Sequence, residues 1–160
     1  MPARIGWLYG GENHRTVRLF SQNVEGGCRA QVWCAWHQRV RAADRVTWIE
    51  TNITAFRPGR RFQVWHDRAV FHFLTDAGDR RRYVTALRTA LAPGGHVVIA
   101  TFGLDGPERC SGLPVQRYRA TTLMAEIGAG FTLMAEDREP HVTPTGTVQQ
   151  FQYCWFRDGN

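Results

Sequence analysis

Residues 86–102 read ALRTALAPGGHVVIATF, in which a helical pattern, a Pro-Gly-Gly break and a β-branched run follow one another. Apolar side chains recur at helical spacing around its start, namely Tyr83, Val84, Leu87 and Leu91. Thr75 or Asp76 can cap this helix, which we expect to end near Ala92. The run at 96–102 predicts a strand buried on both faces, as in a parallel sheet. This stretch therefore predicts an α/β fold.

The rest of the chain supplies further short strands and one more helix. Pro58 and Gly59 interrupt its first half, and Pro-Thr-Gly at 144–146 predicts a tight turn. The predicted elements are strands at 46–49, 62–65, 131–136 and 148–156 and a helix at 121–127. Their order predicts a mostly parallel sheet whose last two strands form an antiparallel hairpin.

Length and composition restrict the class of protein. The 160 residues suffice for a single core without disulfides or metal. All twenty basic residues are arginine and the net charge is +6, but no nucleic-acid-binding motif accompanies this charge. No apolar run has the roughly 20 residues of a membrane span, and the start lacks a secretory signal. We therefore expect a cytoplasmic protein that binds no membrane, no specific nucleic acid and no metal.

Residues 65–75, WHDRAVFHFLT, follow a predicted strand and combine two histidines, an acid and an arginine. In α/β sheets, ligands bind beyond the carboxyl ends of the parallel strands. We expect Asn52, Asp67 and Thr101 to line one cleft there, because each stands at the end of a predicted strand. His72 lies near the start of the next helical segment, and we interpret it as a structural histidine at the edge of the core.

Three stretches together resemble a known family. They are VTWIETNITAF (46–56), FQVWHDRAVFHFL (62–74) and ALRTALAPGGHVVIATF (86–102). In this order and spacing they resemble the latter part of a class I S-adenosylmethionine-dependent methyltransferase, over about residues 40–157. WHDRAV and the DR…Y spacing at 79–83 are also similar to the thiol and thiopurine methyltransferases. The resemblance implies a Rossmann-like sheet and S-adenosylmethionine as the cofactor.

The resemblance also implies roles for single residues. Asn52 stands where the family usually has an acid that hydrogen-bonds the adenine amino group, and its side-chain oxygen can still accept that bond. Ile53 would pack on the adenine ring. His66 and Asp67 match the strand end beside the methionine moiety and the substrate. Arg68, which with Asn52, Ile53 and Asp67 is expected to bind the cofactor, would orient either a carboxylate or Asp67 itself.

On the substrate side we expect Cys110, in CSGLPV (110–115), and His141. His66, Asp67 or His141 can serve as the base if the acceptor must lose a proton. The acceptor is expected to be a small molecule, and a thiol would need the least activation because it is partly ionised near neutrality. His66 and Asp67 are thus the predicted catalytic residues.

The first forty residues do not follow the family pattern, so we divide the chain into an atypical segment at 1–40 and a methyltransferase-like domain at 41–160. The family begins with a strand, an acid–x–Gly–x–Gly loop, a helix and a second strand that ends in an acid. Here LYGGENHR (8–15) has two adjacent glycines without that spacing or a preceding acid. Glu25 can stand for the second acid, but nothing before it is typical of a strand.

Two hypotheses account for this segment. Residues 1 to about 38 come from an alternative start or a shifted reading frame joined near Arg39, or they form a degenerate cofactor loop. The first hypothesis predicts an impaired methyltransferase or a non-catalytic remnant of one. A sheet without its two central strands would also expose the sides of the 46–49 and 62–65 strands that these strands normally cover.

Overall fold

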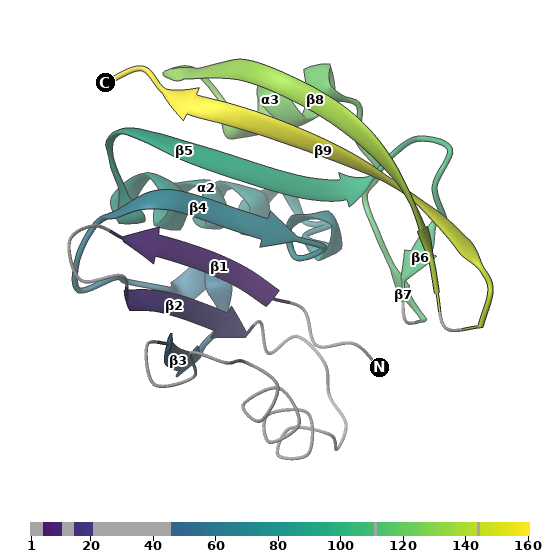
Figure 1. The fold of residues 1–160 in the computed structure, drawn as a ribbon, viewed down its shortest axis with the longest axis horizontal. Coiled ribbons are helices and arrows are strands. Elements are labelled where there is room, and N and C mark those ends of the chain that lie inside the picture. The colour runs from purple at the N-terminus through teal and green to yellow at the C-terminus, as the bar shows by residue number, and fades with distance from the viewer. Residues whose placement is uncertain (1–4, 11–14, 21–45, 111, 144) are drawn as a thin grey trace.

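The computed structural model describes residues 5–10, 15–20, 46–110, 112–143 and 145–160. In these ranges a seven-stranded sheet has the order β3-β2-β1-β4-β5-β9-β8 (Figure 1). Its strands are β1 (Ile5–Gly10), β2 (Arg15–Phe20), β3 (Val46–Glu50), β4 (Phe62–Arg68), β5 (Leu91–Phe102), β8 (Phe131–Val142) and β9 (Val148–Asp158). Glu25 and the proposed junction near Arg39 lie outside the described residues.

The sheet is mixed. β2 is parallel to β3 and β4 is parallel to β5, whereas β1 is antiparallel to both β2 and β4. β9 is antiparallel to both β5 and β8. Among the described strands, β2, β3, β4, β5 and β8 therefore run in one direction, and β1 and β9 run in the other. The predicted Rossmann-like α/β class and the antiparallel C-terminal hairpin are confirmed.

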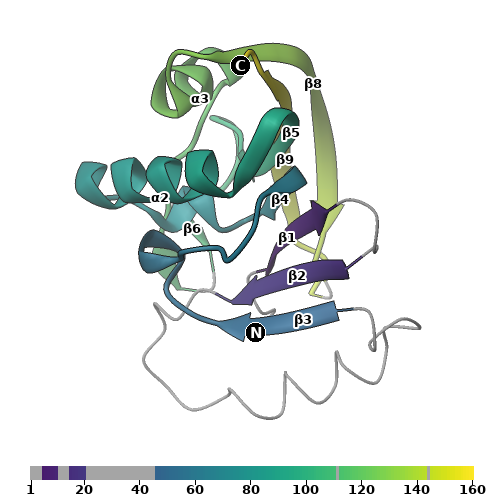
Figure 2. The same ribbon diagram turned by 90° about the vertical axis from the view of Figure 1, so that its left-hand side faces the viewer.

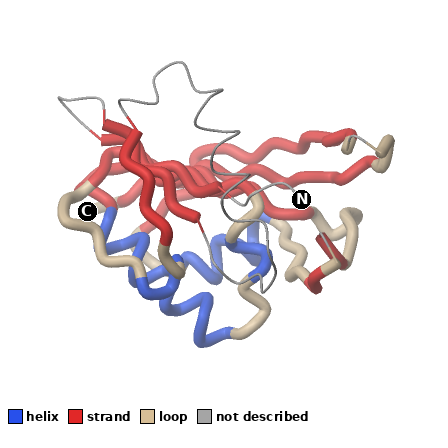
Figure 3. Tube along the Cα trace, turned by 90° about the horizontal axis from the view of Figure 1, so that it is seen from below, coloured by secondary structure: helices blue, strands red, loops and turns tan. Residues whose placement is uncertain are grey.

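Both α-helices of the described ranges, α2 (Ala77–Ala90) and α3 (Ala120–Ile127), lie on the same face of the sheet, as Figure 2 and Figure 3 show. The main core lies between this face and the helices, and several of its side chains are fully buried: Tyr83, Leu87, Val97, Ile99 and Leu123. Neither helix is long and apolar enough to cross a membrane. We call the side of the sheet that these helices cover the helix face, and the other side the open face.

α2 continues directly into β5, and the Pro-Gly-Gly break lies among the first residues of that strand. The helix ends at Ala90, two residues before the predicted position, because Leu91 already has extended backbone geometry. Gly94 has a φ of 69°, a left-handed conformation that glycine adopts without steric cost. The pairing of β4 with β5 shifts register over the same residues. The break therefore turns the chain back along the sheet within a few residues.

Shorter elements follow the strand ends. Turns of 3-10 helix occupy Ile53–Ala55 after β3 and Phe71–Phe73 after β4. A small ribbon of β6 (Arg109–Cys110) and β7 (Leu113–Pro114) follows β5. At the far side of the sheet β8 forms one edge, and its pairing with β9 shifts register between Leu133 and Ala135.

The structure corrects the expectation that the first forty residues contain no strand and leave the sheet without its centre. β1 and β2 form a hairpin that lies between β3 and β4, with Gly10 paired to Arg15. Their sequences show no clear period, but pairing with β3 and β4 satisfies their backbone hydrogen bonds. The hairpin differs from the family's strand–loop–helix–strand unit in the direction of β1.

The cap of α2 gives a stability prediction. The Asp76 carboxylate accepts a hydrogen bond of 2.9 Å from the Asp79 backbone N–H, so Asp76 rather than Thr75 is the capping residue. Asp76→Ala should lower the free energy of unfolding by about 1 kcal/mol in urea denaturation. Thr75→Ala is the matched control and should change it by less than about 0.5 kcal/mol. Equal losses in the two variants would contradict the assignment.

Candidate functional site

The carboxyl ends of β3, β4 and β5 meet at one edge of the sheet. β4 and β5 are parallel with Asp67 beside Ile99 and Arg68 beside Ala100, so Asp67 and Thr101 lie at the same edge, as predicted. Both side chains are buried, however, and they do not line an open cleft. Successive side chains of β4 point to opposite faces. Trp65 and Asp67 are buried toward the helix face, whereas His66 and Arg68 lie on the open face.

Asp67 is at the centre of a buried hydrogen-bond network. Its side chain is 1% exposed, and its two oxygens accept bonds from the backbone N–H groups of Val70 (2.8 Å) and Phe71 (3.0 Å). The Tyr83 hydroxyl of α2 donates to the same carboxylate at 2.6 Å and accepts a bond of 2.8 Å from the Trp65 indole N–H. The network fixes the turn after β4, where Ala69 has a φ of 65°, and ties it to α2.

Burial raises the pKa of Asp67 to about 6, and the bonds from Tyr83, Val70 and Phe71 oppose this rise. Burial and the neighbouring Asp67 raise the pKa of Tyr83 as well, so its phenol stays protonated and donates. Hydrogen-bond donors of the chain itself therefore occupy the Asp67 carboxylate. The catalytic and cofactor-binding roles predicted for Asp67 remain predictions, and its contacts favour a structural role.

His66 lies on the open face of β4, between β1 and β5, opposite Val98. Burial and the charge of Arg68 lower its pKa, so the imidazole is neutral near pH 7. Its Nδ1 atom is buried and has no hydrogen-bond partner among the described residues. A neutral imidazole can accept a proton, and the catalytic role of His66 remains a prediction that this charge state suits.

Arg68 does not orient Asp67, which corrects one of the two predicted alternatives. The two side chains lie on opposite faces because they are neighbours in a strand. Arg68 Nε donates to the Tyr153 hydroxyl of β9 at 2.8 Å, and Nη2 lies 3.5 Å from Glu139 Oε1 of β8. Its guanidinium carbon stands 4.6 Å from the centre of the Phe151 ring. Arg68 therefore reaches toward β8 and β9, away from β3.

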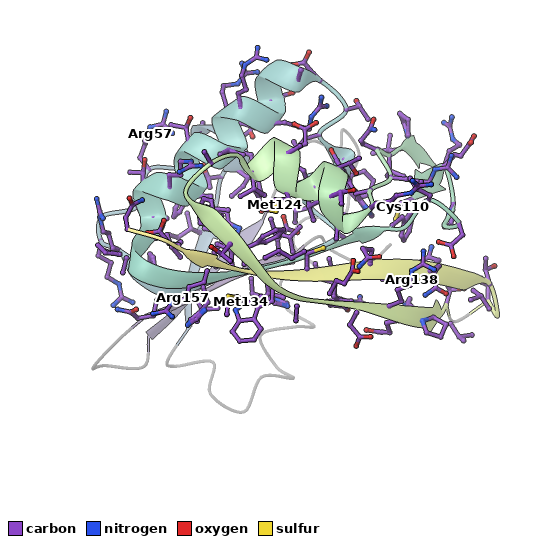
Figure 4. The ribbon with its side chains drawn as sticks, turned by 90° about the horizontal axis from the view of Figure 1, so that it is seen from above. Arg57, Cys110, Met124, Met134, Arg138 and Arg157 are labelled. Atoms are coloured by element: carbon purple, nitrogen blue, oxygen red, sulfur yellow. The ribbon has the colours of Figure 1, made fainter. Side chains whose placement is uncertain are left out.

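The predicted substrate residues Cys110 and His141 lie around the same aromatic ring. Cys110 packs against a small apolar cluster made by Ala100, Phe102 and Phe151. The His141 ring is 6.0 Å from the ring of Phe151. Figure 4 shows Cys110 toward the same end of the molecule as Arg138 of β8 and away from Arg57 and Arg157. The structure thus brings Arg68, Cys110 and His141 together at the carboxyl edge. The substrate roles of Cys110 and His141 and the cofactor-binding role of Arg68 remain predictions.

Asn52 and Ile53 lie at this edge after β3. The Asn52 side-chain oxygen accepts bonds from the Thr54 backbone N–H (3.0 Å) and the Thr54 hydroxyl (2.9 Å). That oxygen is the atom expected to accept from adenine, so its local bonds compete with the predicted contact. Ile53 is 3% exposed and belongs to the main core. Both adenine contacts remain predictions.

His72 is structural, as predicted. It is fully buried in the 3-10 turn at Phe71–Phe73, and its Nδ1 atom accepts a hydrogen bond of 3.3 Å from the Phe102 backbone N–H. The His72 ring also packs against Phe102, with ring centres 4.7 Å apart. This residue links the turn after β4 to the end of β5.

Solved structures are similar to this fold over most of the chain. The N-methyltransferase NodS from Bradyrhizobium japonicum WM9 has a TM-score of 0.65 and 18% identity, covering 82% of this chain and 70% of that chain. The 1,6-didemethyltoxoflavin-N1-methyltransferase from Burkholderia thailandensis has a TM-score of 0.64 and 20% identity, covering 89% of this chain and 61% of that chain. The glycopeptide N-methyltransferase MtfA has a TM-score of 0.57 and 17% identity, covering 80% of this chain and 74% of that chain.

The fold is that of the S-adenosylmethionine-dependent methyltransferases. At these identities the likeness shows the fold alone. No family model matches the sequence. No curated protein matches it either.

Within this methyltransferase fold, the described residues fit the cofactor only in part. The stretch LYGGENHR (8–15) begins within β1, which ends at Gly10, and its last residue, Arg15, is the first of β2. β1 runs antiparallel to β4, with Ile5 beside Arg68 and Tyr9 beside Val64. Gly10 and Arg15, which flank the turn of the hairpin, therefore lie at the edge where β4 begins. The candidate site is at the opposite edge. This placement argues against LYGGENHR as a cofactor loop for that site.

Sequence reasoning missed three residues of the site. Tyr83 was noted only as part of a DR…Y spacing and a helical apolar face, although a tyrosine on such a face needs a partner for its hydroxyl. Tyr153 alternates with buried residues of β9, and this pattern indicates on which face of the sheet it lies but not its hydrogen-bond partner. Glu139 sits in an acidic stretch of β8, and only the strand pairing brings it to Arg68.

The Asp67 network predicts unequal effects at two buried tyrosines. Tyr83→Phe removes a donor to Asp67 and the acceptor of Trp65, and it should lower the free energy of unfolding by about 2 kcal/mol. Tyr118→Phe is the matched control, because the Tyr118 hydroxyl is buried without a hydrogen-bond partner among the described residues. It should be neutral or stabilising. A loss at Tyr118 that matches the loss at Tyr83 would contradict the network.

The raised pKa of Asp67 predicts a pH dependence of stability. The folded chain binds the Asp67 proton more tightly than the unfolded chain, whose pKa is near the ordinary 3.8. Stability should therefore fall as the pH rises from about 4 to about 6, by roughly 3 kcal/mol in total. Denaturation of the wild type and of Asp67→Asn across this range isolates the contribution. Parallel curves for the two proteins would show that Asp67 titrates normally.

Proposed function

We propose that the chain derives from an S-adenosylmethionine-dependent methyltransferase of a small-molecule acceptor and that residues 46–160 provide the acceptor side of the site. The observation that carries this proposal is the gathering of Arg68, Cys110 and His141 at the carboxyl edge of a methyltransferase-fold sheet, with His66 on the same face of β4 as Arg68. The three structural neighbours are named as methyltransferases, and two related structures contain S-adenosylhomocysteine or S-adenosylmethionine. These names support the same reaction class here.

In this proposal His66 is the group that accepts a proton from the acceptor. Its lowered pKa keeps it in the basic form near neutrality. Methyl transfer needs a base only when the nucleophile carries a proton. The main task of the protein is to hold acceptor and methyl donor in line and to exclude water.

We further propose that this chain is impaired, because the described residues leave out groups that hold the methionyl and ribose parts of the cofactor in the family. Supporting this, the carboxyl end of β1 lies at the opposite edge, and β2 ends at Phe20 rather than at an acid. Loss of two or three charge-assisted hydrogen bonds, at about 1.5–3 kcal/mol each, weakens binding by at least roughly a hundredfold. The alternative function, a non-catalytic remnant, has the same support.

Calorimetry tests the impairment. The 160-residue chain should bind S-adenosylhomocysteine at least about a hundredfold more weakly than MtfA does under the same conditions. Transfer of a labelled methyl group to small thiols and amines should be low or undetectable. Micromolar binding by the unmodified chain would contradict the impairment and would show that its N-terminal segment serves the cofactor.

A chimera distinguishes an impaired methyltransferase from a protein with a different function. Residues 1–40 are replaced by the first strand–loop–helix–strand unit of MtfA, and binding of S-adenosylhomocysteine should recover to the micromolar range. Asn52→Asp in the chimera should strengthen binding further, because an acid keeps the acceptor for Thr54 and offers a second oxygen. A folded chimera that still fails to bind would contradict the proposed function.

A further inference from the structure

The open face of the sheet carries a polar cluster in which the resemblance assigns a role to Arg68 alone, and the comparisons assign none. We define the acceptor cluster as Arg68 of β4, Tyr153 of β9 and Glu139 of β8. Arg68 donates to Tyr153 at 2.8 Å and lies 3.5 Å from Glu139. Three strands that are distant in sequence therefore meet through side chains at the end of the sheet where the site lies.

The Arg68 guanidinium already contacts partners within the chain. Its Nε–H is directed to Tyr153, one terminal nitrogen faces Glu139, and one face of its guanidinium lies over Phe151. Its side chain remains 36% exposed, so the cluster is still open to solvent. A guanidinium in this state can support a flat, apolar molecule, but it has less of its charge available for a second anion.

The charged groups near Arg68 also disfavour an anionic ligand. Asp137 stands opposite Tyr153 in the β8–β9 ladder and so shares its face. His66, on the same face, adds no positive charge because burial and Arg68 lower its pKa. Two carboxylates therefore accompany one guanidinium. An anionic molecule would meet repulsion from Glu139 and Asp137 before it could pair with Arg68.

Next to the acceptor cluster lie apolar side chains, of which Ala69, Cys110 and Val115 are partly exposed. Ala100, Phe102 and Phe151 form a small buried cluster, and Ala69, Cys110 and Val115 pack against it. The molecule that fits this combination has an apolar, preferably aromatic body and no negative charge.

We propose that the acceptor bound at this edge is a neutral, largely apolar molecule, and that Glu139 and Tyr153 are specificity-determining residues which reject anions by occupying Arg68. This inference rests on the proposed function, since it takes the edge as the acceptor side of a methyltransferase. It differs from the simpler expectation that an exposed arginine recruits a carboxylate. Here the arginine is neutralised by its own chain.

A pair of isosteric probes tests the selectivity without any cofactor. Phenylacetamide is neutral and phenylacetate carries one negative charge, while their shapes are nearly the same. Backbone amide shifts of the 160-residue chain are followed by NMR at neutral pH and low salt, where partly exposed charges are least screened. We expect phenylacetamide to bind at least about threefold more tightly, with the largest shifts at residues 151–153.

Charge variants then identify the cause. Glu139→Gln should strengthen phenylacetate binding by about fivefold and leave phenylacetamide nearly unchanged. Glu108→Gln is the matched control, because it removes the same charge from another exposed arginine pair, with Arg117 at 3.1 Å. It should leave the ratio of the two affinities unchanged.

Three results would overturn the proposal: phenylacetate binding as tightly as phenylacetamide in the wild type, equal effects of the two glutamate variants, or no shifts at 151–153 with either probe. None of these depends on cofactor binding. A chimera that fails to bind S-adenosylhomocysteine while the probes behave as expected would contradict the methyltransferase reaction and leave the edge as a site for neutral apolar ligands.

Discussion

The buried carboxylate of Asp67 is the point at which β4, the turn that follows it and α2 are joined. A carboxylate removed from water is costly unless donors surround it, and here two backbone N–H groups and the Tyr83 hydroxyl do so. The same three bonds hold Ala69 in its left-handed conformation and set where the 3-10 turn begins. The direction in which Arg68 and His66 leave the sheet follows from this arrangement.

Alternation along β4 gives neighbouring residues different tasks. Trp65 and Asp67 face the helices and hold the strand end in place, whereas His66 and Arg68 face the other way and remain partly accessible. The motif WHDR thus combines an internal support with an external site in four consecutive residues. A substitution at Asp67 would therefore change both stability and the position of the site, and activity alone would not separate the two effects.

The sequence predicted the parts of the fold that local pattern determines. The apolar period of α2, the β-branched run of β5 and the turn between β8 and β9 each carry enough local signal, and the structure confirms them. It did not predict β1 and β2, because their strand character comes from pairing with β3 and β4. Nor could it predict the Arg68–Glu139 contact, which joins residues far apart in the chain. Asp67 appeared functional because an acid beside an arginine and a histidine has the same sequence signature in a core network as in an active site.

The two outer strands of the sheet, β8 and β3, differ in the features that discourage pairing with a further strand. At β8 the outer strand contains Pro140, which lacks an N–H group, a register shift after Leu133, and a run of charged residues at 136–139. Each of these discourages an added strand. At the other end β3 is only five residues long. Association of chains through continued sheets is therefore disfavoured on the β8 side, and the short β3 offers few backbone groups to a further strand.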